Sequence, residues 1–411
     1  MLLVAPAGSY RIAAYTRAAQ ALGLPILVVS NSAHSLVSEV SSGITVDFTD
    51  PEHALEEILS ATASLPVACV LATDDSSTGL CSRLAERLGL PNNDTAAAWL
   101  TQRKDLAREA LARAGCRTPK FQRIELACAD PDSLGVDFPL VLKPLSLSAS
   151  RGVIRVDDAR QFIAALQRID AILAASGQQD EARDYVLAES YIDGDEYAVE
   201  GFMVDGEFHL LTIFDKPEPL TGPFFEETCY LAPTRLGRRQ QRELVAEVAR
   251  CCVAYGLRHG PVHAEARIDG DGPVLVELAA RTIGGQCGQL IEFSLGQKLE
   301  ELVIKGMCGL PLDTGDREMS AGVLMIPISD SGILKRVEGL TEALQTEFVR
   351  DVEIHIRPGY ELVPLPEGAS YLGFIFAQGP DFQRTWQALR EAHSKLRFVT
   401  QPNWQLQPVT G

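Results

Sequence analysis

Two acidic segments joined by a short turn carry the residue types in this chain that are best suited to chemistry. Residues 262–268 and 274–279 have the composition of β-strands, and the turn residues 269–272 stand between them. In an antiparallel hairpin with a three-residue loop, Glu265 lies directly opposite Glu277. Two carboxylates that face each other destabilise a hairpin unless a cation lies between them. This pair predicts a divalent cation with oxygen ligands, above all Mg²⁺ carrying phosphates.

The same register predicts what surrounds the two glutamates. A loop at Gly270–Gly272 places His263 opposite Ala279, and strand alternation keeps His263 on the same face as both carboxylates. Arg281 then lies one strand step further along, where a guanidinium can hold an anion. The alternative is a solvated hairpin whose register is displaced by one residue and whose glutamates are surface charges.

The composition is that of an ordinary globular protein, and it excludes several classes. The 411 residues are 46% hydrophobic and 22% charged, and no apolar run approaches the ~20 residues of a membrane helix. The net charge of −18 argues against a nucleic-acid or anionic-membrane partner, although it is compatible with a nucleotide substrate. Nine scattered cysteines without a C-x-x-C pair predict buried free thiols, and the chain start resembles a strand more than a signal peptide. We therefore expect a cytoplasmic location.

Alternating strands and helices predict a parallel α/β domain over residues 1–100. Its first turn has one glycine in place of G-x-G-x-x-G, and the chain contains no G-x-x-x-x-G-K-[ST] segment. Neither a dinucleotide fingerprint nor a Walker-type site is therefore predicted. Residues 74–77 follow a buried strand and are expected to cap the next helix, with a substrate role at that strand end as the alternative.

Two lysines stand where a cation can face an anion. Lys104 lies in the first turn of a helix predicted for residues 101–114, an unfavourable end for a cation, so it is either solvated or aimed at an anion. Lys143 lies near the end of the strand 139–144 and precedes the small polar segment 146–152. Such a segment can fold over phosphates, although a plain hairpin would show the same composition.

The order of these parts resembles an ATP-grasp ligase over about residues 100–309. The resemblance rests on Pro-Leu-Val-Leu-Lys-Pro (139–144), Ala-Glu-Ser-Tyr-Ile-Asp-Gly-Asp-Glu-Tyr-Ala-Val-Glu (188–200) and Val-Glu-Leu-Ala-Ala-Arg (276–281). Further along, Ala-Gly-Val-Leu-Met-Ile-Pro-Ile (321–328) and Arg-Pro-Gly-Tyr (357–360) are similar to the C-terminal domain of bacterial L-amino-acid ligases, which are dipeptide synthetases. The segment Gly-Pro-Phe-Phe-Glu-Glu-Thr (222–228) also fits that subgroup.

This resemblance implies an α/β and α+β multidomain protein with an ATP-grasp fold. Its expected parts are an N-terminal parallel α/β domain (1–100), an ATP-grasp domain (101–311) with a lid subdomain at about 138–204, and a C-terminal α+β domain (312–411). Strands at 322–328, 352–357 and 372–377 and a helix at 381–396 are predicted for the last domain. It has few candidates for chemistry.

The resemblance also implies a role for individual residues, and it names ATP and Mg²⁺, or Mn²⁺ in its place, as the required ligands. Contacts to ATP are implied for Lys104, Lys143 and the loop residue Ser148 (phosphates), for Glu189, Tyr191 and Ile192 (adenine), and for Glu196 (ribose). Glu265 and Glu277 would bind the metal, and Arg281 would stabilise the transferring phosphoryl group or the tetrahedral intermediate. Glu227 would lie near the amino-acid substrate and pair with its ammonium.

Two positions depart from the family pattern. Many ATP-grasp enzymes have Asn where this chain has Ala279, so a water is expected to replace that metal ligand. Cys229-Tyr230 stands where related ligases often carry Gly-His, which bears on the amino acids accepted and on the base that handles the attacking amine.

The resulting functional prediction is an ATP-dependent, ADP-forming carboxylate–amine ligase. It would join an amino acid or similar carboxylate to an amine through an acyl phosphate, forming a dipeptide. The alternatives are a carboxylase-type enzyme that activates bicarbonate, and a nucleotide-binding protein without turnover. Amino acids or similar small molecules are the expected partners, and a homodimer is the default oligomer.

Overall fold

The structure is a computed structural model that describes residues 1–32, 42–311 and 319–403. The chain folds into two compact units, each assembled from segments that are distant in sequence. The first unit contains Met1–Pro119, Ile192–Ile213 and Arg235–Arg317, and the second contains Lys120–Tyr191, Phe214–Thr234 and Glu318–Gly411. The predicted domain boundary at residue 312 lies outside the described residues.

The first unit begins with a parallel sheet, as the alternating pattern predicts. Its strands lie in the order β3-β2-β1-β4 and pair in parallel throughout. The elements are β1 (Leu2–Val4), α1 (Ile12–Ala21), β2 (Leu27–Ser30), β3 (Ser42–Thr45), α2 (Pro51–Thr62), β4 (Val70–Ala72) and α3 (Asp75–Leu88). Leu2, Val4, Val29 and Val70 of the sheet pack with Leu55 and Ile58 of α2 and Leu84 of α3 in one apolar core.

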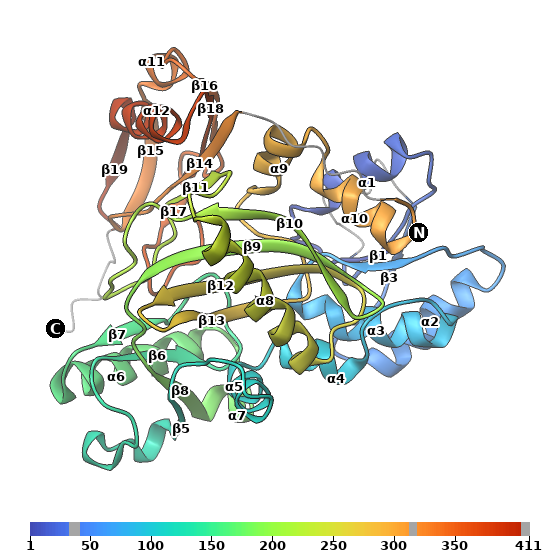
Figure 1. Cartoon of the computed structure of the whole chain (residues 1–411), viewed down its shortest axis with the longest axis horizontal. Coiled ribbons are helices and arrows are strands. Elements are labelled where there is room, and N and C mark those ends of the chain that lie inside the picture. Colours follow the sequence, from blue (N-terminus) through green and yellow to red (C-terminus); the bar gives the residue numbers. More distant parts are fainter. Residues whose placement is uncertain (33–41, 312–318, 404–411) are drawn as a thin grey trace, which may run out of the picture. The chain divides into compact units, whose positions relative to one another are not determined.

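The rest of the first unit contains the antiparallel strands of the acidic hairpin, in the order β13-β12-β9-β10. Helix α8 packs against β13 and β12, and α5 packs on α8 (Figure 1). The elements are α4 (Thr95–Leu100), α5 (Lys104–Arg113), β9 (Asp195–Val204), β10 (Glu207–Asp215, which leads into the second unit), α8 (Arg238–Tyr255), β12 (Gly260–Asp269), β13 (Gly272–Ala279), α9 (Gly288–Leu295) and α10 (Leu299–Met307).

The helix predicted for residues 101–114 is corrected at its start. Arg103 is extended, with φ −122° and ψ 99°, so α5 begins at Lys104, and residues 101–103 connect it to the separate helix α4, which ends at Leu100. Gly115 follows the end of α5 with φ +69°, the left-handed conformation expected of a terminating glycine. Lys104 is therefore the first residue of its helix.

The second unit contains a four-stranded antiparallel sheet in the order β5-β8-β6-β7. Phe162, Ile169 and Leu173 of α6 pack with Leu140, Leu142 and Val186 of the sheet. The elements are β5 (Phe121–Glu125), the short 3₁₀ turns η1 (Leu126–Cys128) and η2 (Pro131–Ser133), β6 (Leu140–Pro144), β7 (Ile154–Val156), α6 (Ala159–Ala175), α7 (Glu181–Asp184) and β8 (Tyr185–Ser190).

The second unit also contains the C-terminal α+β region. Antiparallel strands lie in the order β11-β14-β18-β16, and α12 packs on β14 and β18 (Figure 1). A small sheet has the order β17-β15-β19. The elements are β11 (Cys229–Ala232), β14 (Ser320–Ile326), β15 (Gly332–Glu338), α11 (Leu340–Leu344), β16 (Val349–Ile354), β17 (Glu361–Leu362), β18 (Gly373–Gly379), α12 (Phe382–Lys395) and β19 (Arg397–Gln401). Among the helices that the structure describes, none combines the length and the apolar character needed to cross a bilayer.

Gly194, just before β9, is expected to be important for stability. Gly194 has φ +124°, and a Cβ there would lie 2.2 Å from the carbonyl oxygen of Ile268. We expect Gly194→Ala to lower the free energy of unfolding by about 2 kcal/mol or more. Alanine is strained at this positive φ, and its Cβ would clash with the carbonyl oxygen of Ile268. Thermal and urea unfolding measure the change. Gly270→Ala in the nearby turn is the control, since a Cβ there meets nothing within 4 Å, and an equal loss in both variants would contradict the prediction.

Candidate active site

The acidic hairpin of β12 and β13 has the predicted cross-strand pairs. Glu265 pairs with Glu277, and His263 pairs with Ala279, in an antiparallel ladder. The register prediction is therefore confirmed, and the alternative of a hairpin displaced by one residue is wrong. Two carboxylates consequently occupy facing positions of neighbouring strands.

The route to that register differs from the prediction. The predicted three-residue loop is wrong, because Asp269 pairs with Gly272 and the turn holds two residues. A β-bulge at Val276 then inserts one extra residue into β13 and shifts the ladder back by one position. The two differences cancel, so that Glu277 still faces Glu265.

The bulge is stabilised by a buried arginine. A bulged residue leaves backbone groups outside the ladder, and such groups require another hydrogen-bond partner when buried. Nη2 of Arg108, on α5, donates to the carbonyl oxygen of Val276 at 2.5 Å. Arg108 itself is buried. Helix α5 thus contributes to the alignment of the facing glutamates.

A buried ion pair joins the neighbouring strands β9 and β12. Arg267 is opposite Glu196, with Nε 2.8 Å from Oε2, and its Nη1 donates to the carbonyl oxygen of Ile192 at 2.8 Å. Both side chains are buried, so each charge depends on the other for its solvation. Glu196, the residue predicted to bind the ribose, is therefore paired with Arg267, which also donates to the backbone at Ile192.

His263 joins two carboxylates on this face. Its Nδ1 lies 2.5 Å from Oε1 of Glu200, directly opposite on β9, and its Nε2 lies 3.4 Å from Oε1 of Glu265. Burial alone would lower the pKa of His263, but the two carboxylates outweigh it and raise that pKa to about 9. Burial also raises the pKa of Glu200. A protonated His263 therefore holds Glu265 from one side.

Lys104 and Arg281 complete the cationic surroundings of the hairpin. Nζ of Lys104 lies 3.8 Å from Oε1 of Glu277, so this lysine is aimed at an anion rather than solvated. Nε and Nη2 of Arg281 each lie 3.0 Å from Oδ2 of Asp75 at the start of α3, and Nη1 donates to the carbonyl oxygen of Thr282. Burial alone would lower the pKa of Arg281, but Asp75 and Glu277 raise it further above its ordinary value.

Residues 74 and 75 adopt the predicted capping role and add an ion pair each. Asp74 is the N-cap of α3 in a capping box with Ser77, and its carboxylate pairs with Arg11 at 2.9 Å. Asp75 is the first helical residue and pairs with Arg281. The N-terminal sheet domain therefore positions the arginine of the hairpin.

In the second unit, two predicted ATP contacts form a buried pair. Nζ of Lys143 lies 2.7 Å from Oε2 of Glu189, and both side chains are buried at adjacent strands β6 and β8. Tyr191 follows β8, where its ring stacks on Phe225 at a centroid distance of 6.5 Å. The guanidinium of Arg155 also lies over the ring of this tyrosine, 4.2 Å from its centroid. A cation–carboxylate pair thus lies in a sheet beside an aromatic cluster.

The loop between β6 and β7 contains Ser148 and is more constrained than a flexible loop. Ala149 and Ser150 both have positive φ, at 55° and 53°, which produces a tight turn. The Gly152 N–H donates to the carbonyl oxygen of Pro366 at 2.9 Å. The segment therefore has one anchored end, next to the tight turn.

Glu227 has a lysine partner that sequence reasoning missed. Nζ of Lys216 lies 2.5 Å from Oε1 of Glu227 and 5.1 Å from the ring centroid of Tyr230. Tyr230 and Lys216 are both buried. Glu227, the residue predicted to pair with a substrate ammonium, is therefore already paired with the ammonium group of Lys216.

Glu265 and Glu277 fit a hard divalent cation. Facing carboxylates supply oxygen ligands only, and their side chains are 13% and 39% exposed, so an ion and its waters can reach them. The amino group of Lys104 lies beside Glu277. Ala279 offers no side-chain ligand atom, so phosphate oxygens and water would supply the further coordination.

Three family models match the chain. Residues 16–92 match the ATP-grasp N-terminal domain, residues 136–289 match the ATP-grasp domain, and residues 324–401 match the L-amino acid ligase C-terminal domain 2. The chain is an ATP-grasp ligase that resembles the bacterial L-amino acid ligases. This confirms the predicted fold class and the predicted ATP-dependent, ADP-forming ligase that makes a carbon–nitrogen bond.

Similar proteins agree with this assignment. The structure of an L-amino acid ligase from Bacillus licheniformis superposes with a TM-score of 0.83 and 27% identity, covering 97% of this chain and 98% of that one. A dapdiamide A synthase of Enterobacter agglomerans is 27% identical over 74% of this chain and 73% of its own length. An alanine–anticapsin ligase of Bacillus subtilis is 26% identical over 62% of this chain and 57% of its own length.

Several residues of this ATP-grasp ligase that organise the site escaped sequence reasoning. Glu200 could have been predicted from the sequence, because strand alternation places it on the same face as Glu196. Strand alternation does predict Arg267 on the face of His263 and Glu265, and only its pairing with Glu196 was missed. Lys216 and Arg108 carry no local signal, because their partners become neighbours only in the folded chain.

We expect the pair of Glu196 and Arg267 to be worth several times more stability than an exposed pair. Arg267→Met should lower the free energy of unfolding by about 3 kcal/mol, because it leaves a buried carboxylate without its cation. Adding Glu196→Gln to that variant should recover part of the loss, as measured in a double-mutant cycle by urea unfolding. The exposed i,i+4 pair of Arg239 and Glu243 is the control, with an expected coupling below about 0.5 kcal/mol. Equal couplings would contradict this account.

Proposed function

We propose that this enzyme activates the carboxylate of one amino acid as an acyl phosphate and couples it to the amino group of a second, forming a dipeptide. The observation that carries the proposal is the facing pair of Glu265 and Glu277 in an ATP-grasp chain whose C-terminal region matches an L-amino acid ligase domain. That C-terminal match favours an amine acceptor over the bicarbonate alternative.

The chemistry requires activation because an oxide ion is a poor leaving group. A carboxylate oxygen of the first substrate attacks the γ-phosphorus of ATP, and the bond from that phosphorus to the bridging oxygen of ADP breaks. The amino group of the second substrate then attacks the acyl carbon. Phosphate leaves with the former carboxylate oxygen, and the attacking nitrogen loses a proton. The protein contributes positioning and charge neutralisation.

We assign the nucleotide contacts to the residues implied by the family resemblance. Lys104, Lys143 and the N–H groups near Ser148 are assigned to the phosphates, since lysine donors and exposed backbone amides suit phosphate oxygens. The aromatic cluster around Tyr191, with Glu189 and the backbone at Ile192, is assigned to adenine. Glu196 is assigned to the ribose hydroxyls.

Glu265 and Glu277 are assigned to Mg²⁺, with Mn²⁺ as the substitute expected from the shared preference for oxygen ligands. When bound, the ion neutralises the phosphate oxygens and orients them for in-line transfer. The facing register of the two acids, the histidine behind Glu265 and the lysine beside Glu277 support this assignment.

Arg281 is assigned to the charge that develops on the transferring phosphoryl group. Its guanidinium is fixed by Asp75, which keeps it oriented without an anion present. Donors that are pre-oriented toward developing charge are typically worth about 3 kcal/mol of barrier each. Asp75 therefore acts as a positioning residue for Arg281.

Glu227 is assigned to the ammonium group of an amino-acid substrate. Its present partner is the Lys216 ammonium, and a substrate ammonium would exchange with or join it. Tyr230, beside the same lysine, is the residue of that region whose size would limit the substrate side chain. We also propose a cytoplasmic enzyme that forms a homodimer, on the grounds of its free cysteines and of the commonest symmetry.

The function is tested by incubating the full chain with ATP, Mg²⁺ and all proteinogenic amino acids, singly and in pairs. We expect amino-acid-dependent release of ADP, with a product in the mass spectrum that is one water lighter than the sum of two amino acids. Alanine belongs in every pair set, because one relative is named as an alanine ligase. ADP release that requires bicarbonate and no amine would overturn the proposal, and so would ATP binding without any turnover.

The metal assignment predicts a loss of both turnover and metal binding when one carboxylate is neutralised. Glu277→Gln should abolish turnover and weaken Mn²⁺ binding in the presence of a non-hydrolysable ATP analogue, measured by electron paramagnetic resonance. The amide keeps the size of the side chain but removes the charge that the cation requires. Glu243→Gln on the exposed face of α8 is the control and should change neither. Near-normal activity of the Glu277 variant would refute its role.

A further inference from the structure

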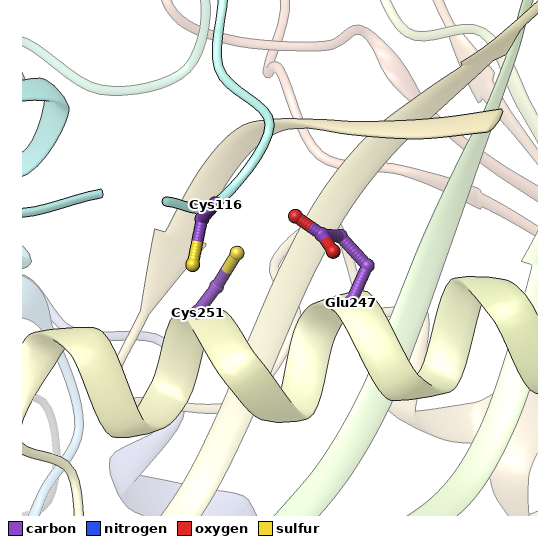
Figure 2. A group of neighbouring side chains, drawn as sticks. All are labelled: Cys116, Glu247 and Cys251. Carbon is purple, nitrogen blue, oxygen red and sulfur yellow. The ribbon is translucent and has the colours of Figure 1, made fainter. Parts of the chain in front are cut away.

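A group of three potential metal ligands lies in the first unit, on elements that the proposed reaction does not use directly. Cys116 follows the last turn of α5, and Glu247 and Cys251 lie one turn apart on α8. Figure 2 shows the two sulfur atoms pointing toward each other and the Glu247 carboxylate on the same side of the helix. One ligand atom from each residue lies within 4.8 Å of the others, and all three residues are buried.

These separations are close to those of a four-coordinate zinc site. Zinc binds thiolates at about 2.3 Å and carboxylate oxygens at about 2.1 Å, which places neighbouring ligand atoms roughly 3.5 to 3.8 Å apart. A bound cation would have to draw the three ligand atoms closer together to reach that size. The i,i+4 spacing of Glu247 and Cys251 directs both side chains from one helix face, as chelation requires.

The charges of the surrounding residues complete the site. Two thiolates and one carboxylate carry three negative charges, and a divalent cation with the Arg250 guanidinium carries three positive charges. Nη2 of Arg250 lies 3.2 Å from Oε2 of Glu247 and donates to the carbonyl oxygen of Gly115 at 2.9 Å. A bound divalent cation would therefore leave the buried group neutral.

Hydrogen bonds already orient the carboxylate ligand. The Arg117 N–H donates to Oε1 of Glu247 at 2.8 Å, and Arg250 holds the other oxygen. Outer hydrogen bonds of this kind orient metal ligands in known sites. Burial and the neighbouring Cys116 and Glu247 raise the pKa of Cys251.

We propose that Cys116, Glu247 and Cys251 bind one zinc-class divalent cation, with water in the fourth position. Thiolates select a borderline metal such as zinc over Mg²⁺, whereas Glu265 and Glu277 offer oxygen alone. The two sites therefore take different ions. Zinc would tie the segment after α5 to α8 and so stabilise the helix that begins with Lys104 and carries Arg108. The proposal does not depend on the substrates of the ligase.

The test begins with the full chain purified without chelators or metal-affinity steps. We expect about one zinc per chain by inductively coupled plasma mass spectrometry, and removal of zinc by a strong chelator should lower the melting temperature by a few degrees. Cobalt added to the stripped protein should saturate at one equivalent, with thiolate charge-transfer absorption in the near ultraviolet. Cys116→Ser and Cys251→Ser should lose that absorption, and Glu247→Gln should weaken cobalt binding.

Cys252→Ser is the matched control, because this buried cysteine is the neighbour of Cys251 on α8 but does not belong to the group. It should bind cobalt as the wild type does. In the wild-type chain, zinc should also slow alkylation of Cys116 and Cys251, measured by peptide mass spectrometry, while labelling of the exposed Cys128 stays constant. This comparison remains valid if a serine variant fails to fold.

Two results would overturn the proposal. One is a metal content, or a cobalt spectrum, that is unchanged in Cys116→Ser and Cys251→Ser. The other is a wild-type chain that binds no metal after reduction and instead joins the two cysteines in a disulfide under mild oxidation, detected as a linked peptide. Either result would leave the group as two buried cysteines that do not bind a metal.

Discussion

The facing pair of Glu265 and Glu277 is the constraint on which the rest of the site depends. Like charges at directly opposed strand positions are unfavourable, so the fold must either separate them or surround them with cations. This chain surrounds them, with His263 behind one carboxylate and Lys104 beside the other. Lys104 is the first residue of α5, an end that repels cations, and the nearby carboxylate offsets that repulsion. The hairpin and the helix therefore need each other electrostatically.

The sequence predicts much of this arrangement and misses how it is built. Strand composition and turn residues are local signals, so the hairpin, the parallel N-terminal sheet and the face shared by His263 and Glu265 follow from them. The bulge at Val276 is not local, because it is stabilised by Arg108 from α5. The predicted pairs were correct although the predicted loop was wrong, since the bulge compensates for the shorter turn. Similarly, the division into two units of interleaved segments depends on contacts that no linear pattern contains.

The sequence does not indicate which oppositely charged residues pair with the predicted site residues. Lys143 pairs with Glu189, which is 46 positions further along the chain (189 − 143). The pair of Glu196 and Arg267 is separated by 71 positions, and the pair of Asp75 and Arg281 by 206. Residue type indicates that each is charged, but only the fold decides which opposite charges meet. Burial makes such pairing necessary, because an isolated charge in the interior costs several kcal/mol. The residues proposed to bind the nucleotide are thus also residues whose charges must be neutralised when no ligand is present.

Ligand binding at such residues is consequently an exchange of partners, and the geometry of Arg281 limits what the exchange costs. A guanidinium has five N–H donors. Within the described part of the chain, Nε and Nη2 serve Asp75 and Nη1 serves the Thr282 carbonyl, which accounts for three of them. The remaining two belong to Nη1 and Nη2, the pair of nitrogens that presents parallel donors to phosphate oxygens. Arg281 can therefore accept a phosphoryl group while Asp75 continues to hold it. A lysine in its place would have a single nitrogen to divide between the aspartate and the anion, so the planar side chain suits the proposed role better.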